Sequence, residues 1–151
     1  KAGYYVAVGD YDKGYAFTPY SKFVKRYIAY PNPLTNKRAF LKCISRIACY
    51  FDFIIPVLER SMIPLVENKE LIEGAGAKLL APDAPSLRIA MDKYELYKMA
   101  TSIGIPCPKT ILIKNMQELR KAVREIGFPL VLKIRKEIKT PPTQRFAIVK
   151  N

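Results

Sequence analysis

The sequence predicts an α/β fold built around a parallel sheet. Short apolar runs rich in β-branched and aromatic residues alternate with longer segments whose apolar residues recur at helical spacing. This alternation is typical of parallel sheets, because each connection between neighbouring parallel strands needs a crossover, usually a helix. With 151 residues, 50% of them hydrophobic, the chain can form one domain of ordinary size, or one domain and the start of another.

Five elements are predicted in the first half of the chain. In order, they are a strand at 3–12, a helix at 35–50, a strand at 51–60, a helix at 62–74 and a short strand at 77–82. The first of these helices has an inward face formed by Phe40, Cys43, Ile44 and Ile47. The segment 81–88 (APDAPSLR) contains two prolines and a turn-prone aspartate, which predict a hinge between domains at 1–82 and 83–151.

The second half begins with a helix that opens at Asp92. An aspartate is a good N-cap, and Glu95 stands three residues further on, as a capping box requires. One apolar stripe is predicted from Leu96, Met99, Ala100 and Ile103. Gly104 then ends the helix.

A strand, a helix and a hairpin are predicted after this helix. Residues 110–113 are apolar and β-prone, and Asn115 with Glu118 caps a second helix. The run 128–133 (FPLVLK) is almost continuously apolar, as expected for a strand buried on both faces. Residues 145–150 (RFAIVK) are predicted to be the returning strand of a hairpin.

Two lysines occupy the ends of these elements. Lys93 opens the first helix of the second half, and Lys133 ends the apolar strand. A lysine at a helix N-terminus opposes the helix dipole, but an anionic ligand bound there would make the placement favourable. Two such cations could converge on one polyanion, so a nucleotide-phosphate site is the leading hypothesis. The alternative for each is a solvated lysine.

The pattern "DK, apolar helix, GIPCP, strand, helix, GFPLVLK" resembles the opening of an ATP-grasp domain, as found in carboxylate–amine ligases, biotin carboxylase and carbamoyl phosphate synthetase. Residues 20–33 (YSKFVKRYIAYPNP) and 51–60 (FDFIIPVLER) resemble segments of the domain that precedes it in that family. The resemblance implies a Rossmann-like parallel sheet over 1–82, followed by the beginning of an ATP-grasp domain over 83–151.

The resemblance also implies a function. The intact protein would be an ATP-dependent ligase of the carboxylate–amine or carboxylate–thiol type that uses Mg²⁺ and forms an acyl phosphate. Lys93 and Lys133 would contact the phosphates of ATP. Glu59 and Asp10, each at the predicted end of a strand, would contact a small carboxylate substrate, because ligands of open α/β sheets bind at that edge. A surface carboxylate is the alternative for both.

The loop at 136–144 departs from the family pattern. The family has a glycine-rich loop there, whereas this loop has two prolines and no glycine. Prolines have no N–H group with which to bind phosphate. Cationic side chains could supply the charge instead, namely Arg135, Lys136, Lys139 and Arg145.

Parts of the family pattern are expected outside this sequence. These are the first strand, the magnesium ligands, the adenine pocket and the catalytic arginine. We therefore expect a fragment or split subunit that is inactive alone and that forms an oligomer or pairs with a complementary chain. The first alternative is a non-catalytic partner or regulatory subunit, which the glycine-free loop favours.

Composition restricts the remaining function classes. The chain has no histidine, which removes Ser–His and Cys–His nucleophiles. A net charge of +13 makes a basic nucleic-acid-binding module the second alternative, although no RNP-like pattern is present. Buried, reduced thiols at Cys43, Cys49 and Cys107 favour a cytoplasmic protein. No apolar run of about 18 residues occurs, so no membrane partner is expected.

Overall fold

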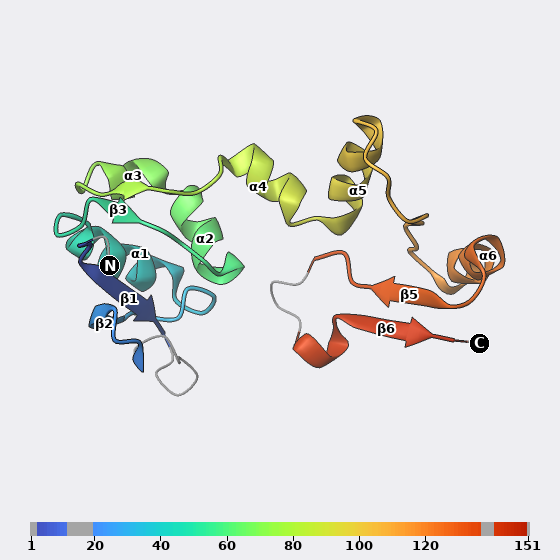
Figure 1. Cartoon of the computed structure of the whole chain (residues 1–151), viewed down its shortest axis with the longest axis horizontal. Helices are drawn as coiled ribbons and strands as arrows, with labels where there is room; N and C mark the ends of the chain where they lie inside the picture. Colours follow the sequence, from blue (N-terminus) through green and yellow to red (C-terminus); the bar gives the residue numbers. More distant parts are fainter. Residues whose placement is uncertain (1–2, 12–19, 137–140, 151) are drawn as a thin grey trace. The chain divides into compact units, whose positions relative to one another are not determined.

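The computed structural model describes residues 3–11, 20–136 and 141–150. The fold is mixed α/β, and the chain divides into two compact units, Lys1–Pro82 and Asp83–Asn151 (Figure 1). Among the described residues, the first unit has two parallel strand pairs and three helices, and the second has three helices and an antiparallel strand pair.

Parallel strand pairing, which the sequence predicts, is present in the first unit, although the strand at Val24–Ala29 was not among the predicted elements. Strand β1 (Val6–Asp10) pairs with β2 (Val24–Ala29), and β3 (Phe53–Ile54) pairs with β4 (Lys78–Leu79). The described strands form two separate pairs, so a continuous Rossmann-like sheet stays a proposal. Strand β3 is much shorter than the predicted 51–60, because Pro56 has no N–H group to donate to a ladder.

Helix α1 (Lys37–Ala48) confirms the predicted helix and supplies much of the first unit's core. It begins after Asn36, whose Oδ1 accepts a hydrogen bond from the Ala39 N–H at 3.1 Å. Its buried residues are Phe40, Leu41, Ile44 and Ala48. Two residues predicted on the inward face, Cys43 and Ile47, are only half-buried.

The single helix predicted at 62–74 is two helices. Helix α2 (Glu59–Val66) begins earlier, and α3 (Lys69–Glu73) follows a break. Pro64 has no N–H group for the carbonyl of Arg60. The Asn68 amide donates back to the carbonyl of Pro64 at 2.8 Å, and Asn68 has left helical geometry with φ −129°. This local hydrogen bond competes with continuation of the helix.

Part of the predicted hinge is helix α4 (Ala84–Ala90), which the sequence interpretation missed. The Asp83 carboxylate caps it by accepting from the Ser86 N–H at 2.7 Å. Pro85 lies in the first turn, where backbone N–H groups have no partner within the helix. The residues interpreted as breakers therefore start a helix.

Helices α5 (Lys93–Ser102) and α6 (Met116–Ile126) begin and end close to where the sequence predicts. At the start of α6, Asn115 Oδ1 accepts from the Glu118 N–H at 2.9 Å, and Glu118 accepts from the Lys114 N–H at 2.7 Å. The apolar stripe predicted on α5 is largely exposed, because that helix buries no residue in the described structure. Its Leu96, Met99 and Ile103 are exposed.

The predicted hairpin is confirmed by β5 (Leu130–Lys133) and β6 (Phe146–Val149), which pair antiparallel (Figure 1). Burial of β5 on both faces is wrong, since Leu130 is 8% exposed and Val131 is 51% exposed. The strand predicted at 110–113 is not formed. A strand forms only where another strand pairs with it. The described strands β5 and β6 pair with each other, so the apolar run at 110–113 pairs with neither of them.

Candidate functional site

The start of α5 and the end of β5 meet in the second unit. The Lys93 N–H donates to the carbonyl of Arg135 at 3.2 Å, and the Ile134 N–H donates to the carbonyl of Arg145 at 3.1 Å. Lys133 lies two residues before Arg135. The backbone thus brings together, from segments far apart in the sequence, the neighbourhoods of four cations predicted to contact nucleotide, namely Lys93, Lys133, Arg135 and Arg145.

A buried carboxylate, Asp92, lies at this junction. Only 2% of Asp92 is exposed. Its Oδ1 accepts hydrogen bonds from the N–H groups of Tyr94 and Glu95 at 3.2 and 3.3 Å, which confirms its predicted role as an N-cap. The same oxygen accepts from Arg135 Nε at 2.7 Å, and Oδ2 lies 3.5 Å from Lys136 Nζ. The hydrogen bond from Arg135 lowers the pKa of Asp92 to about 2, so the carboxylate is ionised near neutral pH.

The guanidinium of Arg135 contacts a second carboxylate. Its Nη2 donates to Glu95 Oε1 at 3.2 Å, and the other oxygen of Glu95 lies 2.7 Å from Lys98 Nζ. The hydrogen bond to Asp92 raises the pKa of Arg135. Sequence reasoning missed this pairing because Asp92 and Arg135 are 43 residues apart, and no local pattern links them. The capping aspartate was the one available signal.

Lys133 lies on an exposed apolar face of the hairpin. It is opposite Phe146 in the register, and Val131 is opposite Ile148. Residues two apart on a strand share a face, so all four project from the same side. Val131 is 51% exposed, Phe146 60% and Ile148 61%. Apolar surface next to a cation suits a ligand with a flat ring and an anionic group.

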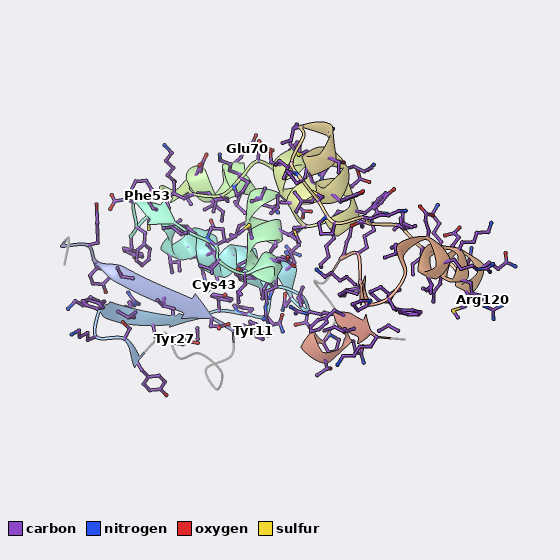
Figure 2. All side chains as sticks on the ribbon, turned by 45° about the vertical axis from the view of Figure 1, so that its right-hand side comes forward. Tyr11, Tyr27, Cys43, Phe53, Glu70 and Arg120 are labelled. Atoms are coloured by element: carbon purple, nitrogen blue, oxygen red, sulfur yellow. The ribbon has the colours of Figure 1, made fainter. Side chains whose placement is uncertain are left out.

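In the first unit, the end of β1 meets the start of α2. Arg60 Nη1 donates to the Tyr11 hydroxyl, and the guanidinium carbon lies 5.1 Å from the centroid of the Tyr11 ring (Figure 2). Asp10 ends β1, as predicted, whereas Glu59 is the first residue of α2 and not the end of a strand. The Arg60–Tyr11 contact therefore brings the neighbourhoods of both predicted substrate residues together.

Tyrosines surround Asp10. Its carbonyl accepts from the Tyr30 N–H at 3.2 Å and from the Tyr27 hydroxyl at 3.3 Å. Burial, and next the charge of Asp10, raises the pKa of Tyr30. Sequence interpretation singled out neither these tyrosines nor Arg60. A cation directly after Glu59, at the start of a helix, was the available signal.

Other chemical groups are sparse in the part of the chain that the structure describes. No three His, Cys, Asp or Glu side chains gather there as a group that could hold a metal ion. Cys43 and Cys107 are half-buried, but Cys49 is exposed, so the expectation of buried thiols is wrong for Cys49. Over the same described ranges, no helix has both the length and the apolar character needed to cross a membrane.

Parallel strand pairs, crossover helices and a terminal hairpin make this an α/β protein.

No family model matches it. The carbamoyl phosphate synthase large chain of Saccharolobus islandicus (strain L.S.2.15 / Lassen #1) is 32% identical over 65 residues, covering 43% of this chain and 6% of that protein. The formate-dependent phosphoribosylglycinamide formyltransferase of Cupriavidus metallidurans is 29% identical over 84 residues, covering 54% of this chain and 20% of that protein.

A solved structure matches over almost the whole chain. The N5-carboxyaminoimidazole ribonucleotide synthetase of Thermotoga maritima has a TM-score of 0.60 and 25% sequence identity, and the match covers 99% of this chain and 35% of that one. The chain is thus distantly related to the ATP-grasp superfamily, as its sequence predicts. It spans only a small part of the length of each of these relatives.

Proposed function

We propose that the chain contributes the ATP-phosphate site of an ATP-dependent ligase, with Lys93 and Lys133 as the principal cations. The observation that carries this proposal is the hydrogen bond from the Lys93 N–H to the carbonyl of Arg135 at 3.2 Å. It holds the start of a helix beside the end of a strand, and each carries one of the two lysines. The distant relation to the ATP-grasp superfamily supports the same assignment.

The electrostatics of the junction suit a polyanion. Lys93 is the first residue of α5, where the helix dipole favours phosphate, while the N–H groups of Lys93, Tyr94 and Glu95 already donate to Arg135 and Asp92. Arg145 enters the same junction through its carbonyl, which accepts from the Ile134 N–H. Lys133 projects from the exposed face of the hairpin that also carries Val131 and Phe146, where its ammonium group would bind phosphate.

The two carboxylates at this junction, Asp92 and Glu95, do not fit the Mg²⁺ that this class of ligase uses. Asp92 is buried against Arg135 and two backbone N–H groups. Glu95 is paired with Arg135 and Lys98. Each oxygen of these two carboxylates already has a cationic or N–H partner, whereas a hard cation such as Mg²⁺ binds several oxygen ligands that are available to it. The phosphate charge in this unit is therefore neutralised by lysine and arginine in our proposal.

For the reaction, we infer attack of a substrate carboxylate on the γ-phosphorus of ATP. An acyl phosphate forms and ADP leaves, and an amine or thiol then displaces phosphate from the acyl carbon. Lys93, Lys133 and Arg145 would hold the phosphates in line and offset the charge that develops on them. In the first unit, Arg60 is the cation suited to a small carboxylate, with Asp10 and Glu59 as further contacts.

The experiment that tests this function is calorimetric titration of the full chain with ATP and Mg²⁺, adenosine, and single-stranded RNA at two salt concentrations. We expect ATP to bind more tightly than adenosine, because the phosphates supply most of the attraction. The net charge of +13 favours nucleic acid as the second candidate. RNA affinity that falls steeply with salt, with no ATP binding, would support that candidate and contradict ours.

A further inference from the structure

Arg135 is committed to protein carboxylates in this structure. We propose that Arg135 is a positioning residue, which acts through Asp92 and Glu95 to fix segment 133–136 against the start of α5 and so sets the placement of Lys93 and Lys133. The identity of the ligand rests on the function proposed above, but the positioning itself is a property of the protein alone.

The geometry of the contacts carries the assignment. Arg135 uses two donors of its guanidinium fork on two carboxylates, Nε to Asp92 at 2.7 Å and Nη2 to Glu95 at 3.2 Å. Its carbonyl accepts the Lys93 N–H at 3.2 Å, so side chain and backbone hold the same helix start. A planar, rigid fork suits such fixed, two-point attachment better than a flexible ammonium does.

The charges at the junction point the same way. Asp92 and Glu95 together offset Arg135 and Lys136, since Asp92 also lies 3.5 Å from Lys136 Nζ. A guanidinium already shared between two carboxylates attracts phosphate weakly, because the nearby negative charges cancel its field. Arg135 therefore contributes through the placement of Lys93 and Lys133 and not through its own charge.

The connectivity explains why one ion pair sets both lysines. Asp92 directly precedes Lys93, and Arg135 follows Lys133 by two residues, although the pair joins positions 43 residues apart. Asp92 is only 2% exposed. An unpaired carboxylate there would be unfavourable, so burial favours the ion pair with Arg135.

Amide hydrogen exchange at Lys93 in the ligand-free full chain tests the positioning. Because its N–H donates to the Arg135 carbonyl, exchange should become about tenfold faster or more in Arg135→Gln and in Asp92→Asn. Asp92→Asn keeps the capping oxygen and removes only the charge. Arg120→Gln is the matched control, the same substitution at an exposed arginine on α6 (Figure 2), and should change nothing.

ATP affinity distinguishes positioning from direct phosphate contact. If Arg135 is a positioning residue, ATP should bind about tenfold more weakly to Arg135→Gln and to Asp92→Asn. The double variant should bind ATP no more weakly than either single variant. If Arg135 contacts the phosphates directly, ATP should bind more weakly to Arg135→Gln. Asp92→Asn, which removes a negative charge, should then bind ATP as tightly as wild type or more tightly. That second pattern would overturn the proposal.

Two further outcomes are separable. Unchanged Lys93 exchange in both variants would overturn the positioning role whatever the ATP result is. A wild-type chain that does not bind ATP would overturn the proposed function, while exchange still decides the role of Arg135. If Arg135→Gln does not fold, Arg135→Lys replaces it, since lysine keeps the charge and loses the fork. Exchange at Lys93 should then lie between those of wild type and Asp92→Asn.

Discussion

Asp92 illustrates what single residues reveal in a sequence and what they conceal. Its role as the N-cap of α5 was predicted from the sequence. That role is local, because the N–H groups that donate hydrogen bonds to it lie within three residues. Its pairing with Arg135 depends on how β5 returns to α5, and no spacing rule contains that information. Lys93 and Lys133 were singled out for their positions at element ends, and their roles in binding stay predictions.

The stability of the second unit should depend on pH through Asp92. Its pKa is lowered from 3.8 to about 2 in the folded protein, mainly by the hydrogen bond from Arg135. The contribution is therefore present above pH 3.8 and is lost as pH falls toward 2. At neutral pH, Asp92→Asn should lower the free energy of unfolding by about 1.5–3 kcal/mol, as expected for a charged hydrogen bond.

Urea unfolding followed by circular dichroism between pH 2 and pH 7 measures this dependence. The acid-induced loss should shrink in Asp92→Asn, which has no proton to bind there. Identical acid profiles for wild type and variant would show that the Asp92–Arg135 pair does not contribute to stability.

At the scale of elements, most helices were predicted from local signals, but two local signals, at Asn68 and Pro85, were missed. Helices α1 and α6 carry their own caps in Asn36 and Asn115. The break between α2 and α3 depends on a side-chain hydrogen bond from Asn68 to the Pro64 carbonyl, and an apolar stripe alone does not predict it. Proline was interpreted as a breaker at Pro85, although a proline in the first turn starts a helix.

The cap of α6 provides a direct test of an element. Asn115→Ala should lower the free energy of unfolding by about 1 kcal/mol, because the Glu118 N–H loses its acceptor at 2.9 Å. Gln117→Ala, at an exposed position in the same first turn, is the control and should change stability by less than about 0.5 kcal/mol. Equal effects of the two substitutions would argue against the cap.

The hairpin offers a second test, because its two faces differ in burial. Leu130→Ala should cost about 2–4 kcal/mol, since Leu130 is 8% exposed and its loss leaves a cavity. Val131→Ala, one residue further along the strand and 51% exposed, should cost less than about 1 kcal/mol. Similar losses at both positions, measured by urea unfolding, would mean that something covers the outer face of β5 in solution.

At the scale of the whole molecule, the sequence predicted an α/β protein related to ATP-grasp enzymes, and the comparisons confirm that relation. Parallel pairing followed from alternation of strands and helices. Burial was over-predicted on β5, and the apolar stripe of α5 is largely exposed, because hydrophobic spacing indicates which face is apolar but not whether another element covers it. Association with a second chain and a cytoplasmic location stay predictions.

Exposed apolar side chains favour association in solution. They include Leu96, Met99, Ile103, Phe146 and Ile148. Exposed apolar patches, such as the stripe of α5 and the outer face of β6, commonly mark a protein interface. Sedimentation velocity should therefore show a species heavier than one chain at micromolar concentration. A single-chain mass at every concentration would contradict this expectation.

The most direct test of the two-lysine phosphate site is ATP binding to a double variant. Lys93→Ala with Lys133→Ala should abolish the calorimetric signal for ATP with Mg²⁺ that wild type gives. The control is Lys114→Ala with Lys121→Ala. It removes the same charge from two exposed positions, one just before α6 and one within it, and it should bind ATP as wild type does. Loss of binding in the first double variant alone would place the phosphates between α5 and β5. Equal binding by both double variants would contradict that site.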